Sequence, residues 1–235
     1  LRVLGGRAPD PDAEIEARKR EALVQLALQA EPHESHKALW ETLDVSYFMR
    51  HDAGDIAWHA RQISRYLHRD EPGQERAGAL VRARRSPVGE GLQVMVYTAD
   101  RADLFARICG YFDQAGFSIM DAKIHTAKNG FALDTFQVVT SMLPEHYREL
   151  TSMVEADLLQ VLLNEGPLPP PGRGRVSRRV RSFPVVPRVD LMPDEKGQRW
   201  LLSISASDRV GLLYLVARVL ARHGISVQLA KITTL

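Results

Sequence analysis

The stretch VMVYTADRADLFARICGYFDQAGFSIMDAKIHTA, from Val94 to Ala127, returns as LSISASDRVGLLYLVARVLARHGISVQLAKITTL, from Leu202 to Leu235. Equivalent residues in the two copies are 108 positions apart, so the alignment needs no gap. Each copy predicts an apolar strand, an Asp-Arg turn, an amphipathic helix, a glycine break and a second strand. The first copy continues beyond this point, whereas the second stops at Leu235. We therefore expect the chain to be a fragment of a longer protein.

The first copy predicts a small domain over residues 90–164. Its first strand alternates apolar and polar residues, which indicates a half-buried strand, and a helical spacing follows. Two more strands are predicted at Phe117–Ala127 and Phe131–Val139, joined by a tight turn at Asn129-Gly130, where both residues tolerate positive φ. A helix opening at Pro144 and a final strand complete the order β-α-β-β-α-β. This is the ferredoxin-like pattern of an antiparallel sheet with helices on one face.

The second copy, residues 199–235, predicts only β-α-β and is an incomplete version of the same domain. Between the copies, residues 165–198 are rich in proline and arginine, and seven prolines between Gly166 and Pro193 exclude regular helix over most of this linker. The piece Phe183–Leu191 is a candidate for an added strand. The arginines of the linker predict a solvated segment rather than a nucleic-acid contact, because no aromatic residues are interleaved for base stacking. They are Arg173, Arg175, Arg178, Arg179 and Arg181.

The N-terminal segment, residues 1–75, predicts a helical connector. Its expected helices are Glu14–Ala30, Glu34–Leu43 and Asp55–Leu67. In the first of them, the apolar stripe expected to face the core consists of Leu23, Leu26, Ala27 and Ala30. The fold class is therefore α+β, a helical connector followed by tandem ferredoxin-like domains of which the second is incomplete.

Composition limits the partners. A hydrophobic content of 45% and a charged content of 26% are typical of a soluble globular protein. The net charge of +2 is too small to indicate binding to nucleic acid or to an acidic membrane, and no apolar run approaches the roughly 20 residues that span a bilayer. The single cysteine, Cys109, is expected to be a small buried side chain of a helix. LRVLGGRAPDPD lacks the apolar core of a signal peptide, so we expect a cytoplasmic protein.

The turn after the first strand of each copy is the candidate binding site. There the chain enters a helix N-terminus, whose unpaired N–H groups and partial positive charge suit an anionic group. In the second copy, Gly211 lacks a Cβ and lets a small ligand approach the backbone, while Asp208 either pairs with an ammonium group or caps the helix. Such a turn suits a free amino acid; the alternative is a capped helix packed on a sheet. The predicted effector-binding residues are Asp208, Arg209, Val210, Gly211 and Leu212.

The first copy offers a weaker version of this turn. Asp103 stands where the second copy has Gly211, so a side chain occupies the place where a ligand would approach, and its carboxylate would repel the carboxylate of an amino acid. The residues of this weaker effector site are Asp100, Arg101, Asp103 and Leu104.

These motifs carry a family resemblance. DRVGLL after a strand, followed by a helix and HGISVQLAKITT, resembles an ACT domain, a small-molecule sensor module. YFMRH, DIAWHAR and DRADLFARICGYFDQAGFSIMDAKIHTAKNGFALDTFQV resemble the C-terminal third of the bifunctional PII uridylyltransferase/uridylyl-removing family, over nearly the whole chain. The resemblance implies two upstream catalytic domains, a nucleotidyltransferase and an HD phosphohydrolase, then two ACT domains. It also implies glutamine as effector, the nitrogen-signalling protein PII as partner, and magnesium as a cofactor of the parent enzyme.

No catalytic and no metal-binding residue is predicted within the chain itself. The Gly-Ser turn and paired aspartates of the nucleotidyltransferase are absent, and so is the metal-binding HD constellation. The literal dipeptide His51-Asp52 belongs to YFMRH, which in the resembled family lies beyond the HD domain. His33, His36, Asp55 and His59 are close to it in sequence, but His33 and His36 flank a proline break, so no metal site is expected. His59 is expected to pack or to form a hydrogen bond.

Two alternative functions remain open at this stage. The tandem domains are either a glutamine sensor or a docking platform for a protein such as PII, and the Asp103 turn suits the second role. A third hypothesis is the amino-acid-sensing region of another metabolic enzyme, against which YFMRH and DIAWHAR argue. An RNA-binding domain is the weakest hypothesis, because no strand carries the paired aromatic residues that stack bases.

Overall fold

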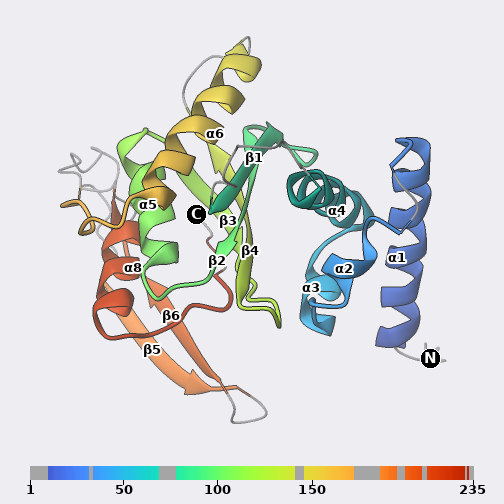
Figure 1. The fold of residues 1–235 in the computed structure, drawn as a ribbon. Helices are drawn as coiled ribbons and strands as arrows, with labels where there is room; N and C mark the ends of the chain where they lie inside the picture. Colours follow the sequence, from blue (N-terminus) through green and yellow to red (C-terminus); the bar gives the residue numbers. More distant parts are fainter. Residues whose placement is uncertain are drawn as a thin grey trace.

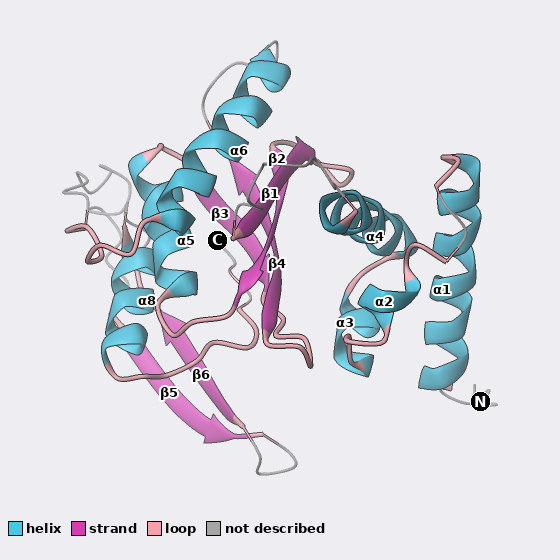
Figure 2. Ribbon diagram, in the orientation of Figure 1, coloured by secondary structure: helices cyan, strands magenta, loops and turns pink. Residues whose placement is uncertain are grey.

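The structure is a computed structural model, and it describes residues 10–31, 34–68, 78–140, 146–171, 186–194, 199–207, 211–230 and 232. A four-stranded sheet stands between two layers of helices, with a two-stranded ribbon at one end (Figures 1 and 2). Within these ranges no helix is long and apolar enough to cross a bilayer.

Four helices form an N-terminal unit, hereafter the helical unit, and aspartates set where three of them begin. Asp10, Asp44 and Asp52 each accept a hydrogen bond from a backbone N–H of the first turn, which satisfies a donor that has no partner inside the helix. The elements are α1 (Pro11–Leu28), α2 (Lys37–Trp40), α3 (Val45–Arg50) and α4 (Ala53–Leu67).

Two expectations for the helical unit are corrected. The predicted helix Glu34–Leu43 is a single turn, α2, and the segment after it forms the unpredicted helix α3. On α1 the buried residues are Ile15, Ala22 and Leu26, whereas Leu23 is 37% exposed. Of the predicted stripe only Leu26 is buried. The other three residues were predicted wrongly, because the face of α1 that packs on α3 and α4 carries Ile15, Ala22 and Leu26.

The central sheet is antiparallel, in the order β1-β2-β4-β3. Its strands are β1 (Ala79–Arg85), β2 (Leu92–Ala99), β3 (Ser118–Lys123) and β4 (Phe131–Val139). The predicted third strand, Phe131–Val139, is confirmed, and the predicted hairpin turn is present, although only Gly130 adopts positive φ, at +80°. The predicted order ends with a strand after the second helix. In the structure the strand that pairs with β2 at the edge of the sheet is instead β1, which precedes residue 90. The edge strand therefore comes from the N-terminal side of the domain and not from its C-terminal side.

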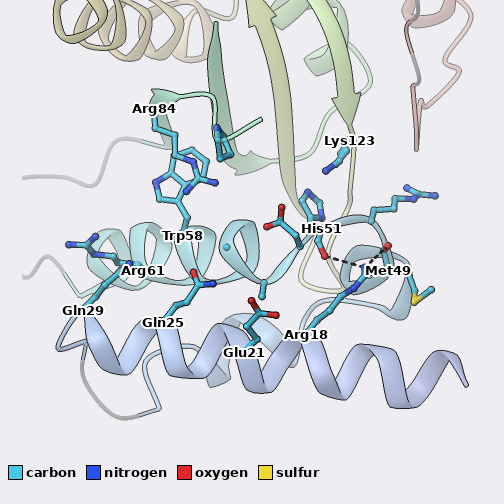
Figure 3. A pocket seen from close by; sticks show the side chains of 15 residues that line it. Arg18, Glu21, Gln25, Gln29, Met49, His51, Trp58, Arg61, Arg84 and Lys123 are labelled. Carbon is cyan, nitrogen blue, oxygen red and sulfur yellow. Dashed lines mark hydrogen bonds between the residues drawn. The ribbon is translucent and has the colours of Figure 1, made fainter. Parts of the chain in front are cut away.

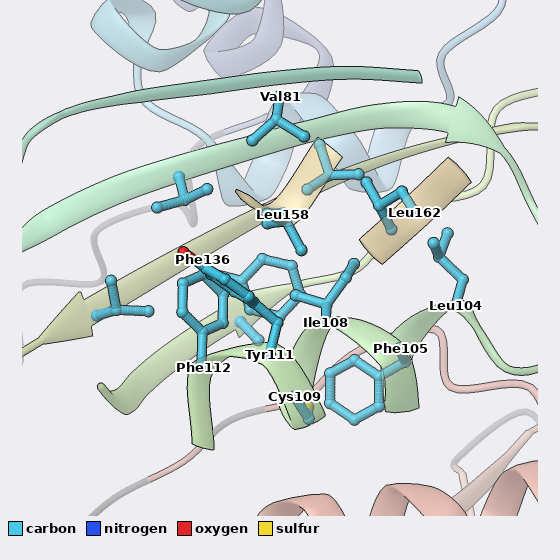
Figure 4. Close-up of a cluster of buried hydrophobic side chains, with 14 of the residues drawn as sticks. Val81, Leu104, Phe105, Ile108, Cys109, Tyr111, Phe112, Phe136, Leu158 and Leu162 are labelled. Carbon is cyan, nitrogen blue, oxygen red and sulfur yellow. The ribbon is translucent and has the colours of Figure 1, made fainter. Parts of the chain in front are cut away.

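Helices α5 (Leu104–Gln114) and α6 (Tyr147–Leu163) cover one face of this sheet. The predicted helical stripe of α5 is confirmed, since Leu104, Ile108 and Phe112 are all buried. They pack with Phe136 of β4 and Leu158 of α6 in one apolar core (Figure 4). The same core takes up Cys109, as expected, and burial raises the pKa of its thiol.

The helical unit covers the other face of the sheet. Met95 and Tyr97 of β2 and Leu133 of β4 pack against it in a second apolar core with Ile56 of α4. Every residue of β2 from Leu92 to Thr98 is consequently buried. The prediction of a half-buried strand was wrong here. The side chains of β2 point alternately into the first apolar core and into the second, so both faces of the strand are buried.

The second repeat begins with the ribbon β5 (Arg188–Pro193) and β6 (Trp200–Ser205), followed by α8 (Leu212–Arg222). The added strand expected at Phe183–Leu191 is therefore present, shifted toward the C-terminus, and it pairs with the first strand of the second repeat. Among the described residues that follow α8, the expected second strand is reduced to one bridge, between Ala230 and Ala122 of β3.

The two repeats contact each other through equivalent elements. Helix α8 packs beside α5, and Ala230 pairs with Ala122 in antiparallel fashion. These two alanines are equivalent, because they are 108 positions apart. Self-pairing of equivalent residues is the property of a two-fold axis. The repeats are therefore related by a local two-fold axis within one chain.

Tyr214 makes the closest helix–helix contact between the repeats. Its side chain is 1% exposed, its hydroxyl donates to the carbonyl of Pro169 at 2.5 Å, and its ring lies over Gly110 of α5. A Cβ added at Gly110 would lie 2.8 Å from the ring. Only glycine allows this approach without displacing a ring that is held at both ends.

We predict that Gly110→Ala destabilises the chain by about 1–3 kcal/mol, the usual cost of overpacking. In a Tyr214→Ala background the same change should instead stabilise it by about 0.5–1 kcal/mol, because alanine favours a helix over glycine. Urea unfolding of the four proteins of this cycle measures both effects. An equal effect of Gly110→Ala in the two backgrounds would contradict the contact.

Candidate functional site

The polar groups of the first turn are bonded within the chain. Asp103 lies between Arg101, at 3.2 Å, and Arg107, at 2.6 Å. The same two arginines donate to the carbonyls of Leu162 and Gly166, at the end of α6 and beyond it. Their guanidinium groups therefore join the turn to α6, and they neutralise the carboxylate that was expected to repel a ligand.

A small cavity of about 20 Å³ lies beside this turn, about the size of one water molecule. Asp100, Leu104 and Asp134 line it, and Ser226 and Val227 of the second repeat line its far side. The first turn thus faces the contact between the repeats. The cavity is too small for an amino acid in this arrangement.

Asp134 is the unusual group of this cavity. It is 1% exposed, and its Oδ1 accepts the backbone N–H of His125 at 3.1 Å. Burial, reinforced by the nearby negative charge of Asp100, raises the pKa of Asp134 to about 8 despite that hydrogen bond. The carboxyl group is thus largely protonated at neutral pH.

Three residues of the second turn, Asp208, Arg209 and Val210, lie outside the described residues. Gly211 is buried and has a φ of +80°, and Leu212 is the first residue of α8. The equivalent Asp103 has a φ of −98°, so the two turns enter their helices with different backbones. The positive φ at position 211 therefore favours glycine.

A much larger cleft, of about 800 Å³, lies between α1, the start of α4 and the strands of the central sheet (Figure 3). We call it the interlayer cleft. Sequence reasoning missed it, because its lining residues extend from Arg18 to Lys123 in the chain and come together only in the folded structure. Its lining is mainly polar: Arg18, Glu21, Gln25, Gln29, Met49, Arg50, His51, Asp52, Ala53, Gly54, Trp58, Arg61, Arg84, Pro87 and Lys123.

Several cations of the cleft have partners in the chain. Arg18 donates to the carbonyls of Phe48, Met49 and His51 and so caps the end of α3. Arg84 donates to Asp55 at 2.8 Å and lies over the ring of Trp58, 4.1 Å from its centre. Arg61 pairs with Glu31 at 2.9 Å. These side chains build the wall, and they leave fewer charges for a ligand than the lining suggests.

The dipeptide His51-Asp52 has a structural role. His51 Nδ1 lies 3.0 Å from the carbonyl of Tyr47, and Asp52 caps α4. The neighbouring His59 is fully buried and bonds to the hydroxyls of Tyr47 and Thr135, which joins the helical unit to the sheet. Desolvation lowers the pKa of both imidazoles, that of His51 to about 3, so both are neutral.

No three metal-binding side chains are grouped together within the described ranges. His51 and His59 instead form hydrogen bonds within the chain.

The chain thus consists of a helical unit packed on an antiparallel α+β domain, and a partial second copy of that domain contacts the first. Such a fold hosts many functions, so the comparisons with known proteins carry the assignment. A family model described as "Uridylyltransferase GlnD fifth domain" matches residues 10–62, the helical unit.

Curated relatives match over 100% of the chain. A bifunctional uridylyltransferase/uridylyl-removing enzyme of Ralstonia nicotianae is 56% identical over 239 residues, and enzymes of the same name from Burkholderia thailandensis and Burkholderia mallei are 50% identical over 235 residues. The chain spans only 27% of the length of these relatives and corresponds to their C-terminal part. Comparison with solved structures gives no significant match. The chain therefore corresponds, over its full length, to the C-terminal part of bifunctional uridylyltransferase/uridylyl-removing enzymes.

We predict that Asp134→Asn stabilises the chain at high pH. An unperturbed aspartate ionises near pH 4, so between about pH 4 and pH 8 the unfolded chain has lost a proton that folded Asp134 retains. The free energy of unfolding therefore falls as the pH rises through this range. Asparagine still accepts the His125 N–H but cannot ionise.

The expected gain at pH 8 is more than about 1 kcal/mol, and it should disappear near pH 4. Urea unfolding across the pH range measures it, with Asp157→Asn, at an exposed aspartate of α6 away from this cavity, as control. A gain that does not change with pH would mean that the Asp134 carboxyl does not retain its proton.

Proposed function

We propose that the chain is the glutamine-sensing regulatory region of an enzyme that attaches UMP to the protein PII and removes it again. The observation that carries this proposal is the 56% identity over the whole chain to the C-terminal part of a relative that bears both activities in its name. The two catalytic activities, and the magnesium they use, belong to nucleotidyltransferase and HD domains upstream of this region. The full-length enzyme acts in the cytoplasm.

The tandem repeats support an ACT-type sensor. Their order of elements, the contact of α5 with α8 and the pairing of Ala122 with Ala230 make a side-by-side pair within one chain. Ser226 and Val227 of the second repeat line the cavity at the turn of the first repeat. The local two-fold axis implies that the equivalent residues, Ser118 and Ile119, face the turn at Gly211. A ligand held there contacts both repeats and so depends on how they are packed.

The second turn is the better effector site of the two. Its Gly211 has positive φ and no Cβ, whereas the first turn carries Asp103 with its two arginine partners. Glutamine binding at the N-terminus of α8 would direct the carboxylate to the unpaired N–H groups and the ammonium to Asp208. Control of two catalytic domains from this site requires glutamine to bind one arrangement better than the other.

We predict that glutamine shifts the two activities of the full-length enzyme in opposite directions, with lower uridylylation and higher removal. A coupling of about 1–3 kcal/mol corresponds to a change of about 5- to 150-fold. Gly211→Asp should abolish the response, because it adds a carboxylate where the ligand carboxylate binds.

The matched control is Gly224→Asp, at a glycine with a φ of +66° and no atom within 4 Å of an added Cβ. It carries the same strain and charge at an open position, and it should retain the response. Glutamine titrations of both activities in the three enzymes make the measurement. Absence of any reciprocal change in the wild-type enzyme would refute glutamine sensing.

A further inference from the structure

We propose that the interlayer cleft is a binding site for a small zwitterion, a free α-amino acid, distinct from the turn at Gly211. The cleft has the volume of a small-molecule site, about 800 Å³, within the usual range of about 300–1,000 Å³. It is bounded by α1 on one side and by the start of α4 and Lys123 of β3 on the other (Figure 3). This inference rests on the proposed function only in that glutamine is chosen as the first ligand to be tested.

Hydrogen-bond acceptors converge at one end of the cleft. A Cβ placed at Gly54 would lie 3.3 Å from Asp52 Oδ1 and 3.7 Å from Gln25 Oε1, so these two oxygens approach each other over the backbone of Gly54. Glu21 also lines the cleft, one turn before Gln25 on α1, and its carboxylate has no ion pair or hydrogen bond to a described residue. Two carboxylates and an amide oxygen fit an ammonium group.

Donors lie at the other end. Lys123 Nζ is 3.6 Å from Asp55 Oδ2, a distance that leaves its N–H groups available. Arg50 makes only one long hydrogen bond to a described residue, at 3.5 Å to the carbonyl of Gln228. A carboxylate fits between these groups.

The neutral His51 adds a hydrogen-bond acceptor. Its Nδ1 must carry the proton, because its partner at 3.0 Å is the carbonyl of Tyr47, which only accepts. Its Nε2 is therefore a bare acceptor, and it is buried without a partner among the described residues. His51 lines the cleft beside Lys123 (Figure 3). An unpaired acceptor of this kind is costly, and a donor group of a ligand or an ordered water would relieve it.

The balance of charge selects a zwitterion. Arg18 is committed to the carbonyls at the end of α3. Arg61 is committed to Glu31, and Arg84 to Asp55. The groups left for a ligand are two cations, Lys123 and Arg50, and two carboxylates, Glu21 and Asp52. A polyanion such as a nucleotide would be repelled by both carboxylates, and a simple cation would be repelled by both basic groups. A molecule with one charge of each sign can avoid both repulsions.

The test is calorimetry on the 235-residue chain with L-glutamine as the first probe. Two analogues each retain one charge: glutaramate, which lacks the ammonium, and L-glutaminamide, which lacks the carboxylate. Both should bind at least about tenfold more weakly than glutamine, since each loses one charged contact.

Two variants remove one end of the site each, with matched controls. Asp52→Asn keeps the helix cap and loses the charge; its control, Asp44→Asn, makes the same change at the cap of α3, outside the cleft. Lys123→Met leaves Asp55 bonded to Arg84 and Gln93; its control is the exposed Lys37→Met. The cleft variants should lower the affinity at least about tenfold and the controls less than about twofold.

The outcomes separate this site from the turn at Gly211. Glutamine binding that is lost in Gly211→Asp but unchanged in both cleft variants would overturn the inference and leave the proposed function intact. Binding of another common amino acid but not glutamine, with the same dependence on Asp52 and Lys123, would support the cleft and refute glutamine sensing. If no common amino acid binds at millimolar concentration, the inference is overturned.

Discussion

Burial of the central sheet on both faces is the constraint on which the rest of the structure depends. β2 carries apolar side chains in both directions, with Val94 and Val96 toward α5 and α6 and Met95 and Tyr97 toward the helical unit. A sheet of this kind cannot leave either face in water, because each exposed apolar side chain would forgo about 1.5–3 kcal/mol. The helical unit is therefore an integral layer of the first repeat, and the interlayer cleft exists because of that layer.

The layer is also fixed in register by polar contacts. Asp55 of α4 is 2% exposed and accepts hydrogen bonds from Arg84 and Gln93, and His59 reaches Thr135. Buried groups that are paired stabilise little by themselves, but they penalise every other arrangement that would leave them unpaired. They define how the helices sit on the sheet, and with it the shape of the cleft.

Much of the fold could be predicted from the sequence, and the failures have physical causes. The repeat gave the helices α5 and α8 and the strand Phe131–Val139, because helical stripes and alternation are local properties. It could not give the edge position of β1, since pairing partners are set by the whole sheet. Nor could it give the second apolar core, because Gln93 and Tyr97 read as the polar side of a half-buried strand. The turn at Gly211 could be predicted as a candidate because a glycine at a helix start is visible locally. The cleft could not, because it joins Gln25, Gly54 and Lys123, whose proximity only the tertiary structure creates.

The two candidate sites differ in what they can couple. A ligand at the Gly211 turn would lie near the contact between the two repeats, where the ring of Tyr214 packs closely on Gly110. A ligand in the interlayer cleft contacts both the helical unit and the sheet, and it stabilises their docked arrangement by an amount that grows with its concentration over its dissociation constant. In the relatives, the matched region is the C-terminal part of a chain almost four times as long. The helical unit, at the start of the region, is therefore the part nearest in sequence to the rest of those chains. The cleft lies between this layer and the sheet, so its occupancy would set how firmly the layer is held.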